Sequence, residues 1–213
     1  MSTSSHRRKP RVREAIREET RAAYREAILE AAAQVFGRLG FHDAKMADIA
    51  TAAGVAAGTL YNYFSSKEEV FASIRDRGME RLAARLVDAI AEPSPLLRLR
   101  AFFRILFAFL QENGALFQIY LRVAGLAEWS RQQLGEPPHE YHARHRALIE
   151  RTLADAQAAG DLRQDLPSGE LAALLSGLAD AEIFAWARRG CPPDLVGKAD
   201  TVLDIFLHGA HSR

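Results

Sequence analysis

Apolar residues recur every three or four positions along most of the chain, and no long stretch alternates between apolar and polar residues. This spacing is typical of amphipathic helices, whereas half-buried strands alternate with a period of two. Glycine, proline and Asn-Gly punctuation separates the periodic stretches. The pattern therefore predicts an all-α protein with about nine helices.

Local signals give the expected ends of these helices. Gly40, Gly54, Gly160 and Gly190 each follow a periodic stretch and are expected as C-terminal caps. Ser66 with Glu69 forms a capping-box pattern that begins a long helix. Ser94 followed by Pro95 begins the next one. The predicted helices are residues 13–39, 46–53, 57–64, 67–90, 95–112, 115–134, 138–159, 168–189 and 193–208.

Two short helices joined by a tight turn at Gly54, after a longer helix, match a helix-turn-helix arrangement. One side of this module is apolar, and Leu60 and Phe64 form a pair four residues apart that is expected to pack inward. The other side of the second short helix carries side chains that can form hydrogen bonds. They are Thr59, Tyr61, Asn62 and Tyr63. This face suits DNA.

The distribution of charge supports a polyanionic partner for the front of the chain only. Net charge is +1, but residues 1–67 hold 11 Lys or Arg against 7 Asp or Glu. A basic arm, residues 1–13, carries Arg7, Arg8, Lys9, Arg11 and Arg13. It could follow a DNA backbone or enter a minor groove, or it could be a solvated tail.

Composition limits the cell compartment in which the chain is expected and the kinds of functional site it can contain. The chain has 213 residues, 48% of them hydrophobic, enough for a sizeable core. No apolar run is long enough to span a bilayer, and the N-terminus lacks the apolar middle of a secretory signal, so a cytoplasmic location is expected. Cys191 is the only cysteine, which fits a reducing compartment.

Residues 25–71 resemble the DNA-binding domain of the tetracycline-repressor (TetR) family of bacterial transcription regulators. The resemblance rests on the glycine and aromatic spacing from Gly54 to Phe64, with Gly40 and Phe41 before it and Lys67 and Glu68 after it. It covers less than a quarter of the chain. It implies three parts: the basic arm 1–13, a DNA-binding domain 14–66, and a ligand-binding and dimerisation domain 67–213.

The resemblance also implies roles for single residues. Thr59, Tyr61 and Asn62 take the positions that read base edges in the major groove, and Tyr63 and Lys67 take phosphate-contact positions. Lys45 and Ala47 are assigned to the same surface. Three positions depart from the family pattern: Lys45 stands where Thr or Ser is frequent, and Ala56 and Ala57 stand where Ser and then Lys or Arg are frequent.

The rear half predicts a large apolar and aromatic interior. The stretch 95–112 is apolar around nearly its whole circumference, which indicates burial on most sides. In the TetR family such a helix often walls a ligand cavity; a filled core is the alternative. The candidate ligand-binding residues are Phe103, Phe107, Tyr120, Arg122, Trp129, His145 and Trp186. His139, His142 and His145 do not converge as metal ligands should, so no metal and no cofactor are expected.

The last two predicted helices, within residues 168–208, resemble in position the pair that forms the family's dimer interface. Small residues at four-residue spacing, Ala173, Gly177, Ala181 and Ala185, would permit close helix approach. The apolar contact is expected from Leu174, Leu178, Val202, Ile205 and Phe206.

Together these features predict a homodimeric repressor that leaves a palindromic operator when a small apolar or amphipathic ligand binds. Two alternatives stand beside it: a ligand-independent regulator, and a helical-bundle lipid carrier or enzyme. No catalytic constellation supports an enzyme.

Overall fold

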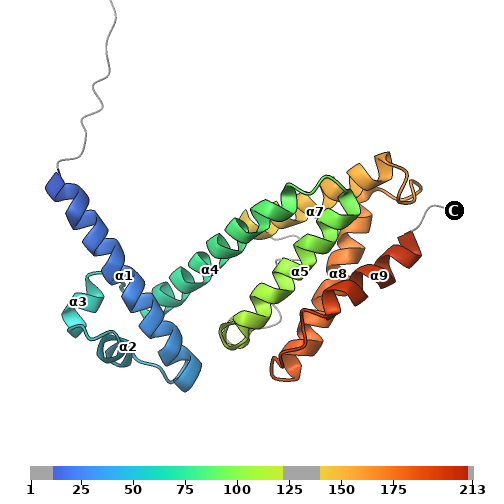
Figure 1. The fold of residues 1–213 in the computed structure, drawn as a ribbon. Helices are drawn as coiled ribbons and strands as arrows, with labels where there is room; N and C mark the ends of the chain where they lie inside the picture. Colours follow the sequence, from blue (N-terminus) through green and yellow to red (C-terminus); the bar gives the residue numbers. More distant parts are fainter. Residues whose placement is uncertain (1–11, 122–139, 211–213) are drawn as a thin grey trace, which may run out of the picture. The chain divides into compact units, whose positions relative to one another are not determined.

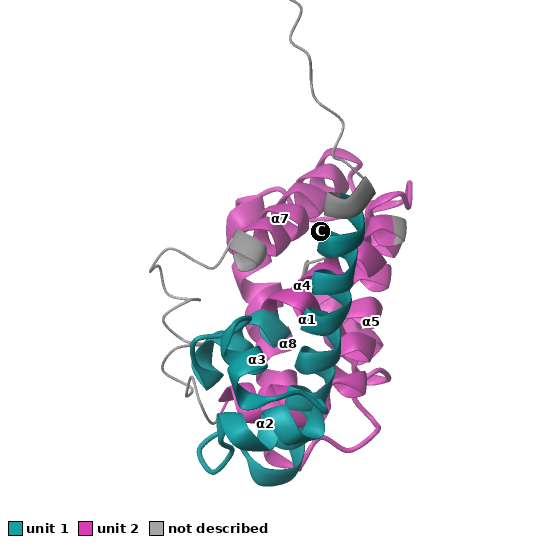
Figure 2. Cartoon of the chain, turned by 90° about the vertical axis from the view of Figure 1, so that its left-hand side faces the viewer, with its two compact units in different colours: residues 1–75 teal, residues 76–213 magenta. Residues whose placement is uncertain are grey.

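The computed structural model describes residues 12–121 and 140–210, and these residues divide into two compact units. The first unit ends at Arg75 and the second begins at Asp76 (Figure 2). The division lies inside α4, after residue 75, whereas the boundary expected from the sequence is after residue 66. The all-α fold class is confirmed (Figure 1).

The first unit is a helix-turn-helix module built on one long helix. It contains α1 (Val12–Leu39), α2 (Met46–Ala52), α3 (Ala57–Tyr61) and the beginning of α4 (Lys67–Ile90). Its core is closed by the apolar faces of these helices, as the spacing predicted. The residues with almost no exposed surface are Ile28, Ala32, Val35, Phe36, Ile49, Leu60, Phe64 and Val70.

The turn between α2 and α3 needs a glycine at one position. Gly54 has a φ of +65°, a left-handed conformation that residues other than glycine rarely adopt.

The helix after this turn, α3, is shorter than the predicted 57–64. The backbone N–H groups of Tyr63 and Phe64 both donate to the carbonyl of Leu60, which closes the helix and turns Phe64 into the core.

The start of α4 uses the predicted cap in a modified form. The amide of Glu69 donates to Ser66 Oγ at 3.2 Å, as expected. The Glu69 carboxylate, however, reaches one residue further back and accepts from both the amide and the hydroxyl of Ser65, each at 2.7 Å. These bonds lower the pKa of Glu69 below its usual value.

The second unit is a helical bundle around a single apolar core. Besides the rest of α4 it contains α5 (Pro95–Glu112), a helix that begins at Gly114 and is described as far as Leu121, α7 (Glu140–Ala158), α8 (Ser168–Arg188) and α9 (Lys198–Ala210). In Figure 1, α5 lies beside α7 and α9, and α8 packs between α7 and α9.

The chain turns sharply between α5 and the next helix, where Gly114 packs against the end of α8. Asn113 ends α5 and its side-chain amide donates to the carbonyl of Phe109 at 2.8 Å. A Cβ on Gly114 would lie 2.9 Å from the Cβ of Cys191 and 3.2 Å from the Trp186 ring. Glycine is therefore required here by packing, and it begins the next helix instead of ending α5.

The last helix begins five residues later than the predicted position 193. The amides of Leu195 and Val196 donate to Oε1 of Gln111 on α5, at 2.9 and 3.2 Å. Because the side chain of Leu195 is fully buried at this turn, the segment before Lys198 is held as a turn by tertiary contacts and does not join α9.

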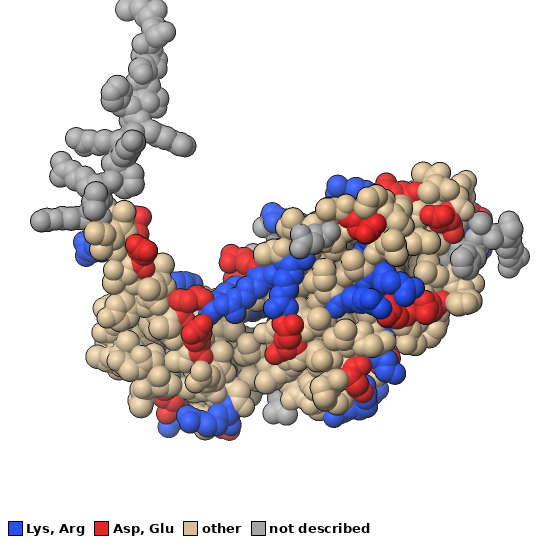
Figure 3. Space-filling view, viewed as in Figure 1, with Lys and Arg blue, Asp and Glu red and all other residues tan. Residues whose placement is uncertain are grey.

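Ion pairs join α5 to α9 on the surface of the second unit. Arg100 and Arg104 both pair with Asp200, and Arg100 also contacts Asp204 at 3.1 Å. The contact with Arg104 lowers the pKa of Asp200. In Figure 3 basic side chains in the region of α5 and α9 accordingly lie beside acidic ones.

Candidate functional site

The second helix of the helix-turn-helix presents one buried and one exposed face. Leu60 is fully buried, whereas Tyr61 is 56% exposed and Asn62 beside it is also exposed. Thr59 is half-buried. The predicted division of α3 into an inward apolar side and an outward polar side is therefore present in the structure.

Tyr63 lies at the edge of this exposed face and rests on α1. Its ring stacks on that of Tyr24 with 6.5 Å between centroids, and the Arg21 guanidinium lies 5.9 Å from its centroid. The next aromatic residue, Phe64, is covered by Arg25 at 4.7 Å. Tyr24 and Arg21 of α1 thus hold the Tyr63 side chain just beyond the end of α3.

The first short helix also begins at the exposed surface. Lys45 is the N-cap residue of α2, and its backbone N–H donates to the Asp48 carboxylate at 2.9 Å. This bond satisfies the N–H of the N-cap residue, whereas a Thr or Ser side chain at position 45 would have accepted from an amide in the first turn of α2. The side chains of Lys45 and Ala47 are exposed.

Lys67 has a different environment from the one its predicted phosphate contact requires. Its ammonium donates to three backbone carbonyls of the segment between α1 and α2: those of Phe41, His42 and Ala44, at 2.9, 2.9 and 3.2 Å. It also lies 4.8 Å from the centroid of the Phe41 ring. An ammonium has three N–H donors, so all of them are used inside the module.

The two alanines that depart from the family pattern leave the start of α3 without a side-chain cap. Ala56 has the extended backbone of an N-cap residue, with φ −66° and ψ 146°, but it offers no side-chain acceptor. Ala57 begins the helix, and both side chains are exposed. No long cation therefore projects from the first turn of α3.

The candidate ligand residues of the second unit are mostly part of its packed core. Phe103, Phe107 and Trp186 have at most 1% of their surface exposed. The Trp186 ring stacks on Phe117 at 6.1 Å, and its indole N–H donates to the carbonyl of Pro192 at 2.7 Å. These side chains are brought together, but as mutually packed groups.

The polar ligand candidates lie at the border of that core. His145 packs edge-on against Phe102 with 5.8 Å between ring centroids, and burial lowers its pKa. Tyr120 is half-buried near the end of the described helix. Arg122 and Trp129 lie outside the described residues.

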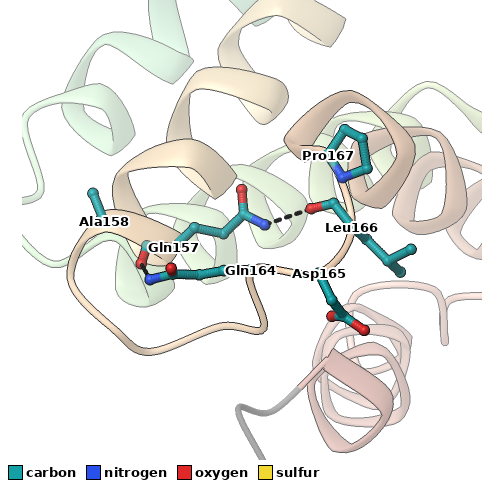
Figure 4. A pocket seen from close by; sticks show the side chains of 6 residues that line it. All are labelled: Gln157, Ala158, Gln164, Asp165, Leu166 and Pro167. Carbon is teal, nitrogen blue, oxygen red and sulfur yellow. Dashed lines mark hydrogen bonds between the residues drawn. The ribbon is translucent and has the colours of Figure 1, made fainter.

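A pocket of about 480 Å³ lies elsewhere, at the turn between α7 and α8 (Figure 4). Its polar groups already bind the turn itself: Gln157 Nε2 donates to the carbonyls of Arg163 and Leu166, and Gln164 Nε2 donates to the carbonyl of Gln157. None of the predicted ligand residues lines this pocket, and we assign it to the structure of the turn.

An exposed apolar strip runs along α8 and α9. Leu174, Leu178 and Ile205 are 55, 39 and 60% exposed. Beside the two leucines lies a row of small exposed residues, Ala173, Gly177 and Ala181. A Cβ on Gly177 would meet no atom within 4 Å.

Two residues predicted for the same strip face the other way. Val202 and Phe206 are each only 6% exposed and belong to the core cluster of the second unit. On α9 they lie on the side that packs toward α5 and α8, so they are unavailable to a partner.

The described residues contain neither a metal-site cluster nor a helix suited to a membrane. No group of three or more His, Cys, Asp or Glu side chains converges as a metal site would among residues 12–121 and 140–210. No helix in these ranges is long and apolar enough to cross a membrane. His139, from the histidine series considered in the sequence, lies outside them.

The model of the family described as "Bacterial regulatory proteins, tetR family" matches residues 28–74. This range contains most of the first unit, including α2, α3 and the start of α4. Among curated proteins, the fatty acid metabolism regulator protein of Bacillus subtilis is 25% identical, over 87% of this chain and 95% of its own.

Solved structures extend the similarity to both units. The fatty acid degradation regulator FadR of Bacillus halodurans has a TM-score of 0.72 and 25% identity, covering 89% of this chain and 97% of its own. The ketosteroid transcriptional regulator KstR2 of Mycobacterium tuberculosis has a TM-score of 0.64 and 25% identity, covering 89% and 95%. With the helix-turn-helix geometry of the first unit, these matches show that the chain carries a DNA-binding domain of the tetR family and is similar over both units to transcription regulators.

Proposed function

We propose that the chain is a homodimeric repressor that binds a twofold operator through α3 of each protomer and is released by an apolar or amphipathic small molecule. The observation that carries the DNA part is the exposed polar face of α3, with Tyr61 at 56% exposure above a fully buried Leu60. Because an operator lies on the DNA of a bacterial cell, the protein would act in the cytoplasm.

Base recognition on this surface would depend on few side chains. Asn62 is suited to a bidentate contact with adenine, and Tyr61 and Thr59 can donate or accept single hydrogen bonds. Because Ala56 and Ala57 supply no cation, a bidentate guanine contact from the first turn of α3 is not available. We therefore expect thymine methyl contacts and DNA shape to contribute strongly to specificity.

Phosphate contacts would come from the residues around α3. The exposed ammonium of Lys45 stands at the start of α2, and Tyr63 stands at the edge of α3. Ala47, which is small and exposed, would let α2 approach the backbone closely. Lys67 would act indirectly, because its ammonium holds the segment from Phe41 to Ala44.

Dimerisation through α8 and α9 would place two copies of α3 on one face of DNA. The exposed strip of Leu174, Leu178 and Ile205 supports it, because exposed apolar surface on neighbouring helices can mark an interaction site. Twofold operators have half-sites about 34–36 Å apart, which requires a dimer of fixed geometry.

The effector would be a compound with a long apolar chain, and two observations support this class. The core of the second unit is rich in aromatic side chains, including Phe103, Phe107 and Trp186, and relatives of similar length are regulators of fatty acid metabolism and degradation. Release would follow if the ligand favoured a different arrangement of the dimer, with α4, which runs through both units, as the connection.

Replacing Asn62 with alanine tests the DNA part. With a duplex selected from a random-sequence library by the purified protein, we expect N62A to lose about 1–3 kcal/mol of binding per half-site. Specificity at one position should relax as well. The exposed Arg151 on α7 gives a control, R151Q, that removes a surface group from the second unit. Selection of no consensus duplex by the wild-type protein would refute the DNA part.

The effector part is tested by titrating the protein–duplex complex with long-chain acyl-CoA, the free fatty acid and a short-chain acyl-CoA. We expect release by one or both long-chain compounds and no effect of the short one, since transfer of apolar chain from water provides about 0.8 kcal/mol per buried CH₂. If calorimetry shows that a long-chain compound binds the protein but the affinity for the duplex does not change, the effector part is refuted. The alternatives are then a ligand-independent regulator or a lipid carrier.

A further inference from the structure

The N-terminal half of α1 extends beyond the rest of the first unit. The side chains from Ala15 to Ala27 are all exposed, whereas Ile28 is fully buried. Figures 1 and 2 both show this half reaching past α2 and α3. At 1.5 Å per residue, residues 12–27 measure roughly 24 Å. Little of this length contributes to the core of the unit.

The exposed half of α1 has a basic face and an acidic face. Arg17, Arg21 and Tyr24 lie within about 60° of one another around the helix axis, given 3.6 residues per turn. Glu19 and Glu26 lie on the opposite side. Arg25 and Glu18 lie next to each other on one flank between these faces, so the segregation concerns the other four charged residues between Ala15 and Ala27.

The basic face is the continuation of the side that carries Ile28 into the core further along the helix. It also contacts Tyr63, two residues beyond the end of α3: Arg21 lies 5.9 Å from the Tyr63 ring and Tyr24 stacks on the same ring. Arg25, by contrast, covers Phe64 and donates to Ser73 Oγ at 2.8 Å, so its guanidinium, although exposed, is already bound to other parts of the unit.

We propose that Arg17 and Arg21 form a second DNA contact, which binds phosphates flanking the segment that α3 would read. The stacked rings of Tyr24 on α1 and Tyr63, two residues beyond α3, connect the two contacts. The proposal rests on the proposed DNA-binding function. Its basis is charge complementarity and continuity with the exposed face of α3. Arg17 and Arg21 are one turn apart, about 6 Å along the axis, which suits neighbouring phosphates.

Phosphate contacts have a thermodynamic signature that a structural role lacks. Each phosphate neutralised by a cation contributes about 0.9 to the slope of log affinity against log salt. In a dimer each substitution occurs twice. Loss of both arginines should therefore reduce the magnitude of this slope by up to about 3.6.

The test uses the R17Q/R21Q variant of the full chain and two forms of the selected duplex. One form carries ten additional base pairs beyond each half-site, and the other ends at the half-site. We expect the variant to bind the long duplex about tenfold or more weakly at 0.15 M salt, with a reduced salt slope. On the trimmed duplex the variant and the wild type should bind equally. E19Q, on the opposite face of the same helix, should bind both duplexes like the wild type.

An unchanged salt slope on the long duplex would overturn the proposal, as would an equal loss on both duplexes. Either result would leave the proposed function intact if N62A still loses affinity. Failure of the wild-type protein to select any duplex would instead refute the function itself. Helix content by circular dichroism distinguishes loss of contacts from loss of the helix.

Discussion

Replacing Lys67 with methionine should destabilise the first unit and weaken operator binding through that loss. Methionine keeps most of the aliphatic side chain but removes the ammonium that donates to the carbonyls of Phe41, His42 and Ala44. Hydrogen bonds from charged groups contribute about 1.5–3 kcal/mol. Because Lys67 is only partly buried and water can replace some bonds, we expect a total loss of about 2–3 kcal/mol. Urea unfolding followed by circular dichroism measures it.

Lys45→Met provides the matched control, because it removes an exposed ammonium from the same module. The cap of α2 uses the backbone N–H of residue 45, so K45M should unfold like the wild type and lose only salt-dependent affinity. If instead K67M unfolds normally and loses only salt-dependent affinity, then Lys67 contacts phosphate directly, as the family resemblance implied.

The features that the sequence predicted correctly are those decided by neighbours in the chain. The spacing of Leu60 and Phe64 placed both in the core, and both are buried. The pattern Ser94-Pro95 placed the start of α5, where Ser94 Oγ accepts from the amide of Leu97. Period and capping are local properties, so they can be recognised without knowing the tertiary structure.

The features that the sequence did not reveal depend on residues far apart in the chain. Lys67 binds carbonyls 23 to 26 residues away, and Gln111 holds a turn 84 residues away. No sequence motif predicts either contact. The side of α9 that is buried was also ambiguous, because Phe206 and Ile205 are both apolar, and only packing on α5 and α8 decides between them.

The same ambiguity affects the candidate effector site. The aromatic residues around Trp186 were expected either to line a cavity or to fill a core, and composition does not distinguish these outcomes. In the structure Trp186 has its indole N–H bound and its ring stacked. An effector that enters among these side chains would have to displace such contacts, so binding and a change in the packing of α8 would be coupled.

Introducing glutamate at both Leu178 and Ile205 should convert the proposed dimer to a monomer and abolish tight operator binding. Both side chains are exposed in the single chain, so the substitutions should leave its core and its helix content unchanged. In a dimer they would bury like charges against each other at the twofold interface. Linking two binding modules raises affinity by about 10²–10⁴, and we expect a loss in this range. Analytical ultracentrifugation and duplex titration measure the two effects.

Leu97→Glu on α5 is the matched control, since Leu97 is 53% exposed, between Leu178 and Ile205, and lies outside the α8–α9 strip. It should remain dimeric and bind the duplex normally. If L178E/I205E stays dimeric, another surface forms the interface. If it becomes monomeric but keeps its affinity, each protomer reads its site independently, and the operator need not be twofold. Loss of both properties together would mean that the exposed strip is what holds the two copies of α3 at the spacing of DNA half-sites.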